Sequence, residues 1–564
     1  MTRLSVRTHV AHFAQIVARV AARYRLTAPC MALIAGTVAA AAFPASTLSA
    51  QGSAPTRARQ QLSAPRPVLV VFLTIDQMIP DYFARFGAQF TGGLRRLQAG
   101  GVLYTNGFQD HATTETAPGH ASTMSGRFPV HTGIVRNNAG VNDSTHPLIG
   151  GGPGASPFRF QGTTLTDWIV AADPRARALS VSRKDRGAIL PIGRSKQSVF
   201  WFGNDGRFTT SSWYADSLPT WLVRFNSRRL PHRMAGTAWT LLRTASSYPE
   251  RDSVPVESQG RGFLFPHALP TDTMQAVRSI AEDPRMDWLT LQTALAGLNA
   301  MQLGKGPSTD MLAISLSTTD AIGHRYGPDS REIHDQLLRL DRYIGEFLDS
   351  LYKVRDSSRI VIALTADHGV QPYPELHFAG TPGATLRIDT DPVLTPAKRA
   401  LAARGLDTTR AIDFEYGMLF ADSAAFRAAK IPLDSVLTSL AAAARKLPGV
   451  ARVDKRTDLA TADTLRDDIA RRWLHALPPS LRVVMLISPK PNVYWKGVTY
   501  ATHGSPNDSD ARVPILFYGP GFARGVTNTR TVRVVDMAPT LAARIGVTAT
   551  EKLDGVVLRD AFRR

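Results

Sequence analysis

The sequence is almost free of cysteine. Cys30 is the only one among 564 residues, and it follows Pro29 near the N-terminus, a poor context for lipid attachment. A single thiol cannot form an intramolecular disulfide or a cysteine-rich structural zinc site. Any metal ion bound by the rest of the chain must therefore be held by Asp, His or Thr side chains.

Acidic residues are absent from residues 1–50, which contain five arginines. The apolar run that follows the arginines, M-A-L-I-A-G-T-V-A-A-A-A-F, is rich in alanine and short for the roughly 20 residues of a membrane span. A basic start, a short apolar core and small residues at its exit are typical of a secretory signal; a single membrane anchor is the alternative. We predict a signal peptide at 1–50, a linker at 51–66 and an exported bacterial protein, periplasmic or extracellular, without a stable membrane anchor.

Lysine is also scarce, because only 11 of the 66 basic residues are lysine, although the net charge is +20. The basic residues form no dense run with interleaved aromatics, so we expect no nucleic-acid partner. A basic surface does attract phosphate-bearing substrates. The hydrophobic content of 44% suits a globular protein with a sizeable core, built as two or more domains or as one large α/β domain with insertions.

Three extended apolar runs end in acidic residues. V-L-V-V-F-L-T-I-D ends at Asp76, M-L-A-I-S-L-S-T-T-D at Asp320, and I-V-I-A-L-T-A-D-H-G contains Asp367 and His368. Such runs predict buried parallel strands, whose carboxyl ends are where α/β enzymes place their chemistry. A lone aspartate at a strand end commonly caps a helix or turn. Three of them, two accompanied by histidine, predict a metal site.

Two further histidines complete this set. His324 follows Asp320 by four residues, which is one turn if the segment is helical, and His503 lies in Y-A-T-H-G-S. Aspartate and histidine without sulfur are compatible with zinc, and ligand type alone leaves manganese or iron open.

The segment H-A-T-T-E-T-A-P-G-H contains Thr116 just before Pro118 and Gly119, which introduce a helical pattern. We expect Thr116 at a helix N-terminus, where free N–H groups and the helix dipole favour an anion; a plain N-cap threonine is the alternative. In K-D-R, Lys184 and Arg186 point the same way if the segment is extended, so they present two cations to one dianion. A solvated strand face is the alternative for this pair.

Seven motifs follow one another in a fixed order: I-D-Q-M, T-A-P-G-H, H-T-G-I-V-R-N-N, K-D-R-G, D-x3-H, A-D-H-G and T-H-G. With them the chain resembles the alkaline phosphatase superfamily, and most closely the PafA-like alkaline phosphatases with a threonine nucleophile. The resemblance implies an α/β fold over 67–564, in which helices flank a central mixed, mostly parallel sheet. It also implies insertions at about 196–307 and 371–501 that wall the active site.

The resemblance also implies roles for individual residues. One zinc ion would lie on Asp320, His324 and His503, and a second on Asp76, Asp367, His368 and the Thr116 oxygen. Thr116 would form a phosphothreonine, and Asn137, Lys184 and Arg186 would hold the phosphoryl oxygens. Asn138 is an alternative to Asn137, the hydroxyls of Thr113 and Thr114 lie nearby in sequence, and His120 has no assigned role.

These roles describe an exported, zinc-dependent phosphomonoesterase acting on small-molecule phosphate monoesters. A nucleotide pyrophosphatase/phosphodiesterase would share the metal ligands and Thr116, but the two cations of K-D-R match a dianionic monoester better than a monoanionic diester. A sulfatase is disfavoured, since it would need Cys or Ser where Thr116 stands. A non-catalytic zinc- or phosphate-binding envelope protein is the distant alternative.

Overall fold

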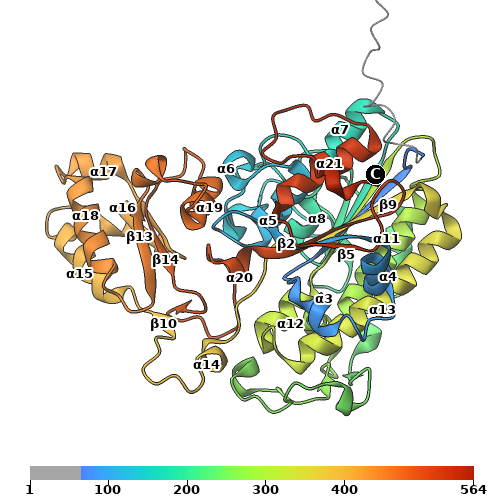
Figure 1. Ribbon diagram of the computed structural model, residues 1–564, viewed down its shortest axis with the longest axis horizontal. Helices are drawn as coiled ribbons and strands as arrows, with labels where there is room; N and C mark the ends of the chain where they lie inside the picture. The colour runs from blue at the N-terminus through green and yellow to red at the C-terminus, as the bar shows by residue number, and fades with distance from the viewer. Residues whose placement is uncertain (1–64, 564) are drawn as a thin grey trace, which may run out of the picture. The chain divides into compact units, whose positions relative to one another are not determined.

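The structure is a computed structural model that describes residues 65–563 (Figure 1). The predicted signal peptide and the predicted linker up to residue 64 lie outside the described residues. The described residues belong to one compact unit. Within the described range, no helix is both long enough and apolar enough to cross a membrane.

A mixed, mostly parallel sheet forms the centre of the fold. Its strand order is β17-β2-β16-β9-β1-β8-β3-β4-β5, with β18 also paired to β2. The five central strands from β9 to β4 are parallel, whereas β16 runs antiparallel to both β9 and β2. The strands are β1 (Leu69–Ile75), β2 (Gly101–Phe108), β3 (Ala178–Ser182), β4 (Ser198–Phe202), β5 (Phe208–Thr209), β8 (Asp310–Leu316), β9 (Ile360–Thr365), β16 (Arg512–Tyr518), β17 (Val526–Asn528) and β18 (Val532–Arg533).

The three apolar runs of the sequence are neighbouring strands at the middle of this sheet. Strand β1 lies between β8 and β9, and every residue of the three strands is buried. In the register of the sheet, Thr74 is opposite both Ser315 and Thr365, so the three carboxyl ends lie side by side. The prediction of buried parallel strands with adjacent ends is confirmed.

Helices cover both faces of the sheet (Figure 1). On one face α11 (Arg285–Ala300) packs on β3 and β8, and α13 (Arg331–Val354) packs against α11 and α4 (Gly93–Gly100). The other face carries α5 (Thr116–Ser125), α7 (Leu165–Ala172), α8 (Asp185–Ile189) and α21 (Met537–Ile545). Helix α21 ends at Ile545, and Gly546 follows it in the left-handed conformation that glycine commonly adopts after a helix.

The interval at about 196–307 was expected to be an insertion, but part of it belongs to the central sheet and to the helices that cover it. Strands β4 and β5 extend the sheet beside β3, and α11 covers it. The S-V-F-W-F sequence of β4 explains this, because Val199, Phe200 and Trp201 are buried as part of the main apolar core.

The interval at about 371–501 builds an antiparallel sheet of its own. Its order is β11-β12-β14-β13, formed by β11 (Ile412–Glu415), β12 (Met418–Ala421), β14 (Val483–Pro489) and β13 (Val450–Lys455). An apolar cluster separate from the main core packs beneath it and includes residues from α15 (Asp391–Ala402) and α18 (Leu433–Ala444). This interval is therefore more than a set of loops around the active site, since it buries an apolar core of its own.

Helix α5 is held directly against the end of β9. A Cβ atom added at Gly119 would lie 2.1 Å from the backbone oxygen of Asp367, closer than any real contact. Only glycine allows the first turn of α5, which begins at Thr116, to approach the residues that follow β9.

We expect Gly119→Ala to lower the free energy of unfolding by about 1–3 kcal/mol, the usual cost of overpacking, and to reduce activity because α5 must move away from Asp367. The gain in helix propensity of roughly 1 kcal/mol opposes this loss but is smaller, since a backbone oxygen cannot yield as a side chain can. Gly306→Ala is the matched control, because only one atom, at 3.9 Å, lies near the added Cβ. Equal denaturation midpoints for the two variants would contradict this packing argument.

Candidate active site

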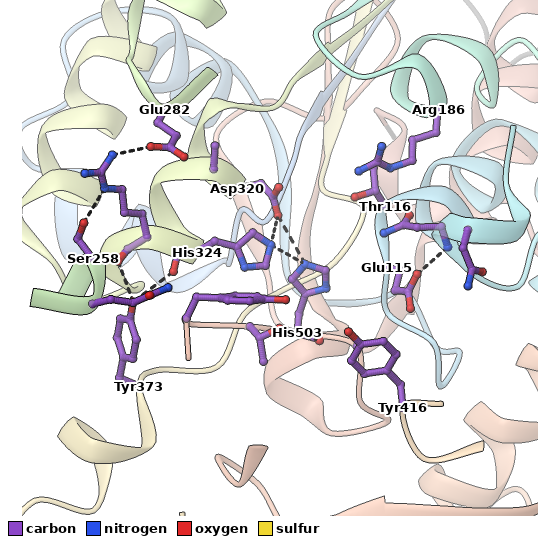
Figure 2. Close-up of a pocket in the computed structure, with 18 of the residues that line it drawn as sticks. Glu115, Thr116, Arg186, Ser258, Glu282, Asp320, His324, Tyr373, Tyr416 and His503 are labelled. Atoms are coloured by element: carbon purple, nitrogen blue, oxygen red, sulfur yellow. Dashed lines mark hydrogen bonds and ion pairs between the residues drawn. The ribbon is translucent and has the colours of Figure 1, made fainter. Parts of the chain in front are cut away.

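A cavity of about 680 Å³ opens at the carboxyl edge of the central sheet (Figure 2). Its walls come from distant parts of the chain, including the start of α5, the helix α12 (Thr318–Tyr326), the β11–β12 hairpin and the segment before β16. Of the residues proposed from the sequence, Thr116, Asn137, Arg186, Asp320, His324 and His503 line it. Asp76, Lys184, Asp367 and His368 are buried, with Lys184 in contact with both Thr116 and Asp320.

Thr116 is the first residue of α5, as the sequence predicts, with Glu115 at the N-cap. Its side chain is buried, and Lys184 Nζ lies 3.3 Å from its hydroxyl oxygen. The N–H group of Ala117 donates to Asn137 Oδ1 at 2.8 Å. Asn137 is thus tied to the first turn of the helix, directly beside Thr116.

Asn137 and Asn138 have different hydrogen-bond partners. The backbone N–H of Asn137 donates to Glu115 Oε2 at 2.6 Å, so Glu115 also holds this residue at the helix start. Asn138 instead turns away and donates through Nδ2 to Glu415 Oε1 at 2.9 Å. The pattern places the amide of Asn137, rather than that of Asn138, beside Thr116.

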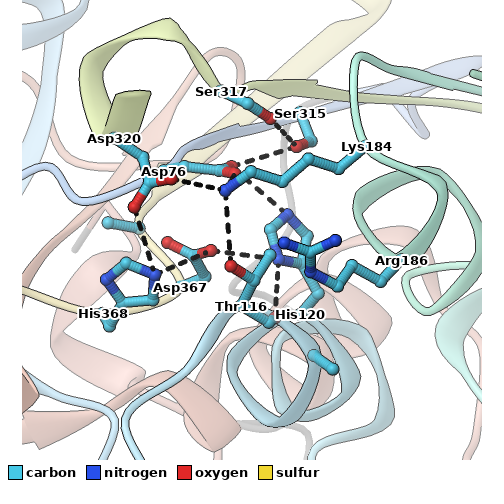
Figure 3. A network of polar contacts seen from close by, with 12 residues as sticks. Asp76, Thr116, His120, Lys184, Arg186, Ser315, Ser317, Asp320, Asp367 and His368 are labelled. Carbon is cyan, nitrogen blue, oxygen red and sulfur yellow. Dashed lines mark hydrogen bonds and ion pairs between the residues drawn. The ribbon is translucent and has the colours of Figure 1, made fainter. Parts of the chain in front are cut away.

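Lys184 lies at the centre of the polar network that Figure 3 shows. Its Nζ is 2.9 Å from Asp76 Oδ2 and 2.7 Å from Asp320 Oδ2. One buried cation thus contacts the hydroxyl of Thr116 and the carboxylates that follow two different strands.

The expectation that K-D-R is extended is wrong. Lys184 itself has extended backbone angles, but it is the N-cap of α8, and Arg186 lies in the first turn of that helix. Asp185 in the first turn favours this helix start. Arg186 still lines the cavity, and Figure 3 shows both cations near Thr116.

Asp320 does not follow its strand directly either. Strand β8 ends at Leu316, and Asp320 lies in the first turn of α12, so His324 is one helical turn further on. His324 Nε2 is 3.2 Å from Asp320 Oδ1, and His503 Nε2 is 3.6 Å from the same oxygen.

His368 also approaches this oxygen, with its Nε2 at 3.8 Å. The rings of His368 and His503 are stacked with centroids 3.5 Å apart. Three imidazoles therefore surround one carboxylate oxygen.

The hydrogen bonds of these imidazoles show which nitrogen is protonated. The Nδ1 atoms of His324, His503 and His368 face the carbonyl oxygens of Ala501 at 2.6 Å, Thr114 at 2.7 Å and Gly369 at 3.0 Å. Because a carbonyl oxygen only accepts, each Nδ1 donates, and in the neutral ring each Nε2 presents a lone pair towards Asp320. Lone pairs that converge on a carboxylate require a cation, and backbone-oriented imidazoles are the usual arrangement around a metal.

A second group of donors lies deeper. Asp76, Asp367 and His120 bring one ligand atom each within 4.8 Å of one another, as do Asp320, His368 and His503 in the first group. Asp367 Oδ2 and His368 Nε2 are 3.4 Å apart, and neither has a hydrogen-bond partner among the described residues. Buried polar atoms without partners are costly, so these donor atoms also fit a metal ion.

His120, which has no role in the sequence analysis, belongs to this second group. Its Nδ1 donates to the Thr116 carbonyl at 2.9 Å and lies 3.3 Å from Asp367 Oδ2, and its Nε2 is 3.5 Å from Asp76 Oδ1. The spacing of four residues from Thr116 on a helix is the signal that could have indicated it.

The sequence analysis assigns no role to Gln77. Its backbone N–H donates to Asp367 Oδ1, and its side chain donates to Asp320 Oδ1, both at 3.1 Å. Its φ of +66° is unusual for a residue other than glycine. Gln77 links the two donor groups, and no pattern in the sequence distinguishes it from an ordinary residue after a strand.

Thr113 and Thr114 lie close to Thr116 in sequence, but their surroundings differ from those of Thr116. The hydroxyl of Thr114 donates to the Ser505 carbonyl at 2.9 Å, and the Thr114 carbonyl accepts from His503, so both groups are engaged in holding the segment around His503. The Thr113 hydroxyl is buried without a hydrogen-bond partner among the described residues.

The electrostatics of the site favour the charged carboxylate and neutral His368. Burial raises the pKa of Asp320, but Lys184 and then His324 lower it by more, so this pKa is well below its usual range. Burial, reinforced by His503, brings the pKa of His368 well below its usual range. Burial lowers the pKa of His503 too, but Asp320 more than offsets this and the pKa is raised. Asp320 thus attracts positive charge to its surroundings.

Residues 70–475 match the family model described as type I phosphodiesterase / nucleotide pyrophosphatase. The chain belongs to this family. Within it, the chain is similar to the alkaline phosphatases PhoV of Synechococcus elongatus and PafA of Elizabethkingia meningoseptica, each 30% identical. The matches cover 88% and 87% of this chain and 93% of each relative. PhoK of a Sphingomonas species is 31% identical over 88% of this chain and 91% of its own length.

The fold agrees with these relatives. The crystal structure of the alkaline phosphatase PafA superposes with a TM-score of 0.81 at 27% identity, covering 89% of this chain and all of that one. Murine ectonucleotide pyrophosphatase/phosphodiesterase 5 has a TM-score of 0.51 at 15% identity, which shows a shared fold alone. The chain is thus a hydrolase with an alkaline-phosphatase-like fold, closer to PafA than to this phosphodiesterase.

We expect metal ions to stabilise the protein, because five of the six residues of the two donor groups are buried. Saturating a single site at 100 times its dissociation constant adds about 2.7 kcal/mol. Chelation should therefore lower the melting temperature, and added Zn²⁺ should restore it, as followed by calorimetry with metal analysis of the same samples. Asp320→Asn should respond less to Zn²⁺. An unchanged melting temperature in verified metal-free protein would show that the donor groups bind no metal.

Proposed function

We propose that the protein is an alkaline phosphatase that hydrolyses small-molecule phosphate monoesters through a phosphothreonine on Thr116, with two zinc ions as cofactors. The observation that carries this proposal is the environment of the Thr116 hydroxyl. It lies at the start of α5, 3.3 Å from Lys184 Nζ, and Lys184 in turn contacts Asp76 and Asp320 from the two donor groups.

The donor chemistry supports zinc. The imidazoles of His503, His368 and His120 belong to the two groups and that of His324 lies beside the first, and this many imidazoles is more than a dedicated magnesium site uses. Asp320, His324 and His503 would hold one ion, and Asp76, Asp367, His368 and Thr116 the other. Zinc ions bound there supply positive charge that lowers the pKa of nearby hydroxyl groups and stabilises an in-line displacement at phosphorus.

Residues of the chain carry out the remaining steps of the reaction. Thr116 Oγ1 attacks phosphorus, the bond from phosphorus to the ester oxygen breaks, and the leaving alcohol takes up a proton. Water then attacks the phosphothreonine, which releases inorganic phosphate and restores the hydroxyl. Lys184 favours the negative charge that develops on the Thr116 oxygen, since it already lies within hydrogen-bonding distance. Two inversions give net retention at phosphorus.

Asn137, Lys184 and Arg186 would bind the non-bridging oxygens of the phosphoryl group. One crystal structure of PafA is of a variant with substitutions at a threonine, an asparagine, a lysine and an arginine. The threonine and asparagine of that variant are 21 positions apart and its lysine and arginine 2 apart, as Thr116 and Asn137, and Lys184 and Arg186, are here. This agreement supports the same four positions in this chain.

A nucleotide pyrophosphatase/phosphodiesterase is the second candidate, because the family model is described by that activity. It would use the same donor groups and Thr116. The two cations favour the monoesterase. A monoester has one more charged oxygen than a diester, and Lys184 and Arg186 both lie near Thr116, where they would bind it (Figure 3).

We expect Arg186→Ala to lower kcat/KM strongly for an aryl phosphate monoester and much less for the matching aryl diester. A charge-assisted contact contributes about 1.5–3 kcal/mol, which is roughly tenfold to a hundredfold in rate. Lys184→Ala should also narrow the preference for the monoester over the diester. Because this substitution leaves Asp76 and Asp320 without the Lys184 cation, the metal content of the variant must be measured.

Arg194→Ala is the matched control, because Arg194 is exposed and lies outside the cavity. Wild-type protein that prefers the diester, or equal losses on both substrates in Arg186→Ala, would favour the phosphodiesterase.

We also propose that the protein is exported, on the strength of the basic and then apolar N-terminal segment at 1–50. We expect the N-terminal sequence of protein recovered from the periplasm or medium to begin near Gln51. Recovery of the enzyme with an intact Met1 from the cytosolic fraction would contradict export.

A further inference from the structure

The cavity is far larger than a phosphoryl group. Thr116, Asn137 and Arg186 occupy one part of its wall, and the remainder of the 680 Å³ must accommodate the rest of a substrate. Two of the residues along that remainder are exposed aromatics, Tyr416 and Tyr500, whose side chains are 47% and 40% exposed. Neither takes part in the chemistry described above.

Tyr416 lies at the tip of the β11–β12 hairpin. Glu415 pairs with Met418, so the turn consists of Tyr416 and Gly417 alone, with φ angles of +44° and +85°. Two positive φ angles define the tight turn in which asparagine followed by glycine is strongly preferred. A bulky aromatic residue is strained in the first of these positions, and such strain is concentrated at functional sites.

The turn cannot relax by moving Gly417. A Cβ atom there would lie 2.5 Å from the Ile487 backbone oxygen, so this glycine is packed directly on β14. The neighbouring Phe414 packs edge-on against Trp495 with ring centroids 5.3 Å apart. The hairpin tip is therefore packed against the sheet behind it, which holds Tyr416 in its strained conformation.

The tip is also fastened to the catalytic side of the cavity. Glu415 forms an ion pair with Arg136 and accepts a hydrogen bond from Asn138 at 2.9 Å. These two residues flank Asn137, which lies beside Thr116. Tyr416 thus has a defined position relative to the residues that would bind the phosphoryl group, although it comes from the separate antiparallel sheet.

Tyr500 approaches from the neighbouring wall. Its ring stands edge-on to His324 at a centroid distance of 5.4 Å, and the next residue, Ala501, accepts the hydrogen bond of His324. Burial raises the pKa of Tyr416, and the charges of Tyr500 and Glu115 add to the rise. Figure 2 shows Tyr416 facing the cavity close to Glu115 and His503.

We propose that Tyr416 and Tyr500 form a subsite for a flat aromatic group in the leaving portion of the substrate. The inference rests on the proposed function and narrows it to phosphate monoesters that carry an aromatic ring. The ring could be bonded to the ester oxygen itself, as in an aryl phosphate, or lie one ribose away, as in a nucleoside 5′-monophosphate. An alkyl phosphate such as glycerol phosphate has nothing to stack on the tyrosines.

The test compares kcat and KM for 1-naphthyl phosphate, adenosine 5′-monophosphate and glycerol 1-phosphate in wild type, Tyr416→Ala, Tyr416→Phe and Tyr416→Asn. Aromatic contacts of this kind change affinity by about three- to tenfold. We expect Tyr416→Ala and Tyr416→Asn to raise KM for at least one aromatic substrate by this factor with little change in kcat, because the contact is the same in the ground and transition states. Tyr416→Phe should keep the wild-type KM, and glycerol 1-phosphate should be unaffected throughout.

Stability provides an independent readout. Asparagine suits the turn better than tyrosine does, so Tyr416→Asn should raise the melting temperature while it weakens the binding of the aromatic substrate. Phe158→Ala is the control, since Phe158 is 43% exposed and lies outside the cavity. The substrate whose KM responds identifies which ring position the subsite serves.

Two results would overturn the inference: unchanged KM for both aromatic substrates, or an equal rise for glycerol 1-phosphate, which would make Tyr416 a purely structural residue. Either result leaves the proposed phosphatase intact, because all three monoesters would still be hydrolysed by wild type. Failure of wild type to hydrolyse any of the three would instead contradict the proposed function.

Discussion

The register of three parallel strands is the constraint on which the rest of the site depends. Strand β1 pairs with β8 on one side and β9 on the other, so their carboxyl ends lie at the same level of the sheet. Asp76, Asp320 and Asp367 follow these ends, and a shift of one residue in either pairing would turn the side chains of the strand to the opposite face. The apolar core that fills both faces fixes the register, and thereby the distances between the carboxylates.

Burying these charges is unfavourable unless each has a partner, and the surrounding residues supply most of them. Lys184 contacts Asp76 and Asp320, Gln77 donates to both Asp320 and Asp367, and three backbone carbonyls orient the imidazoles. The left-handed φ of Gln77 is unfavourable for its own backbone, but Gln77 makes these hydrogen bonds in that conformation. The buried atoms that have no hydrogen-bond partner within residues 65–563, notably Asp367 Oδ2 and His368 Nε2, are suited to a cation.

Much of the fold could be predicted from the sequence, because buried parallel strands and a glycine-terminated helix such as α21 have local signals. The start of α5 at Thr116 could be predicted as well, but two other helix starts could not: Asp320 and Arg186 lie in first turns, where their motifs alone suggested a strand end and an extended segment. Tertiary contacts were also hidden. His120 and Gln77 both contact Asp367, which is hundreds of positions away in the sequence. Tyr416 reaches the cavity because a separate sheet forms between β9 and β16.

The central claim is that Thr116 carries the phosphoryl group during turnover. The most direct measurement is acid quenching of the enzyme during hydrolysis of an aryl phosphate, followed by mass spectrometry of the peptide that contains Thr113, Thr114 and Thr116. We predict phosphate on Thr116, formed with substrate and lost once substrate is exhausted. Phosphate on Thr113 or Thr114 would contradict the assignment, and so would inversion at phosphorus with a chiral substrate, because it would indicate direct attack by water.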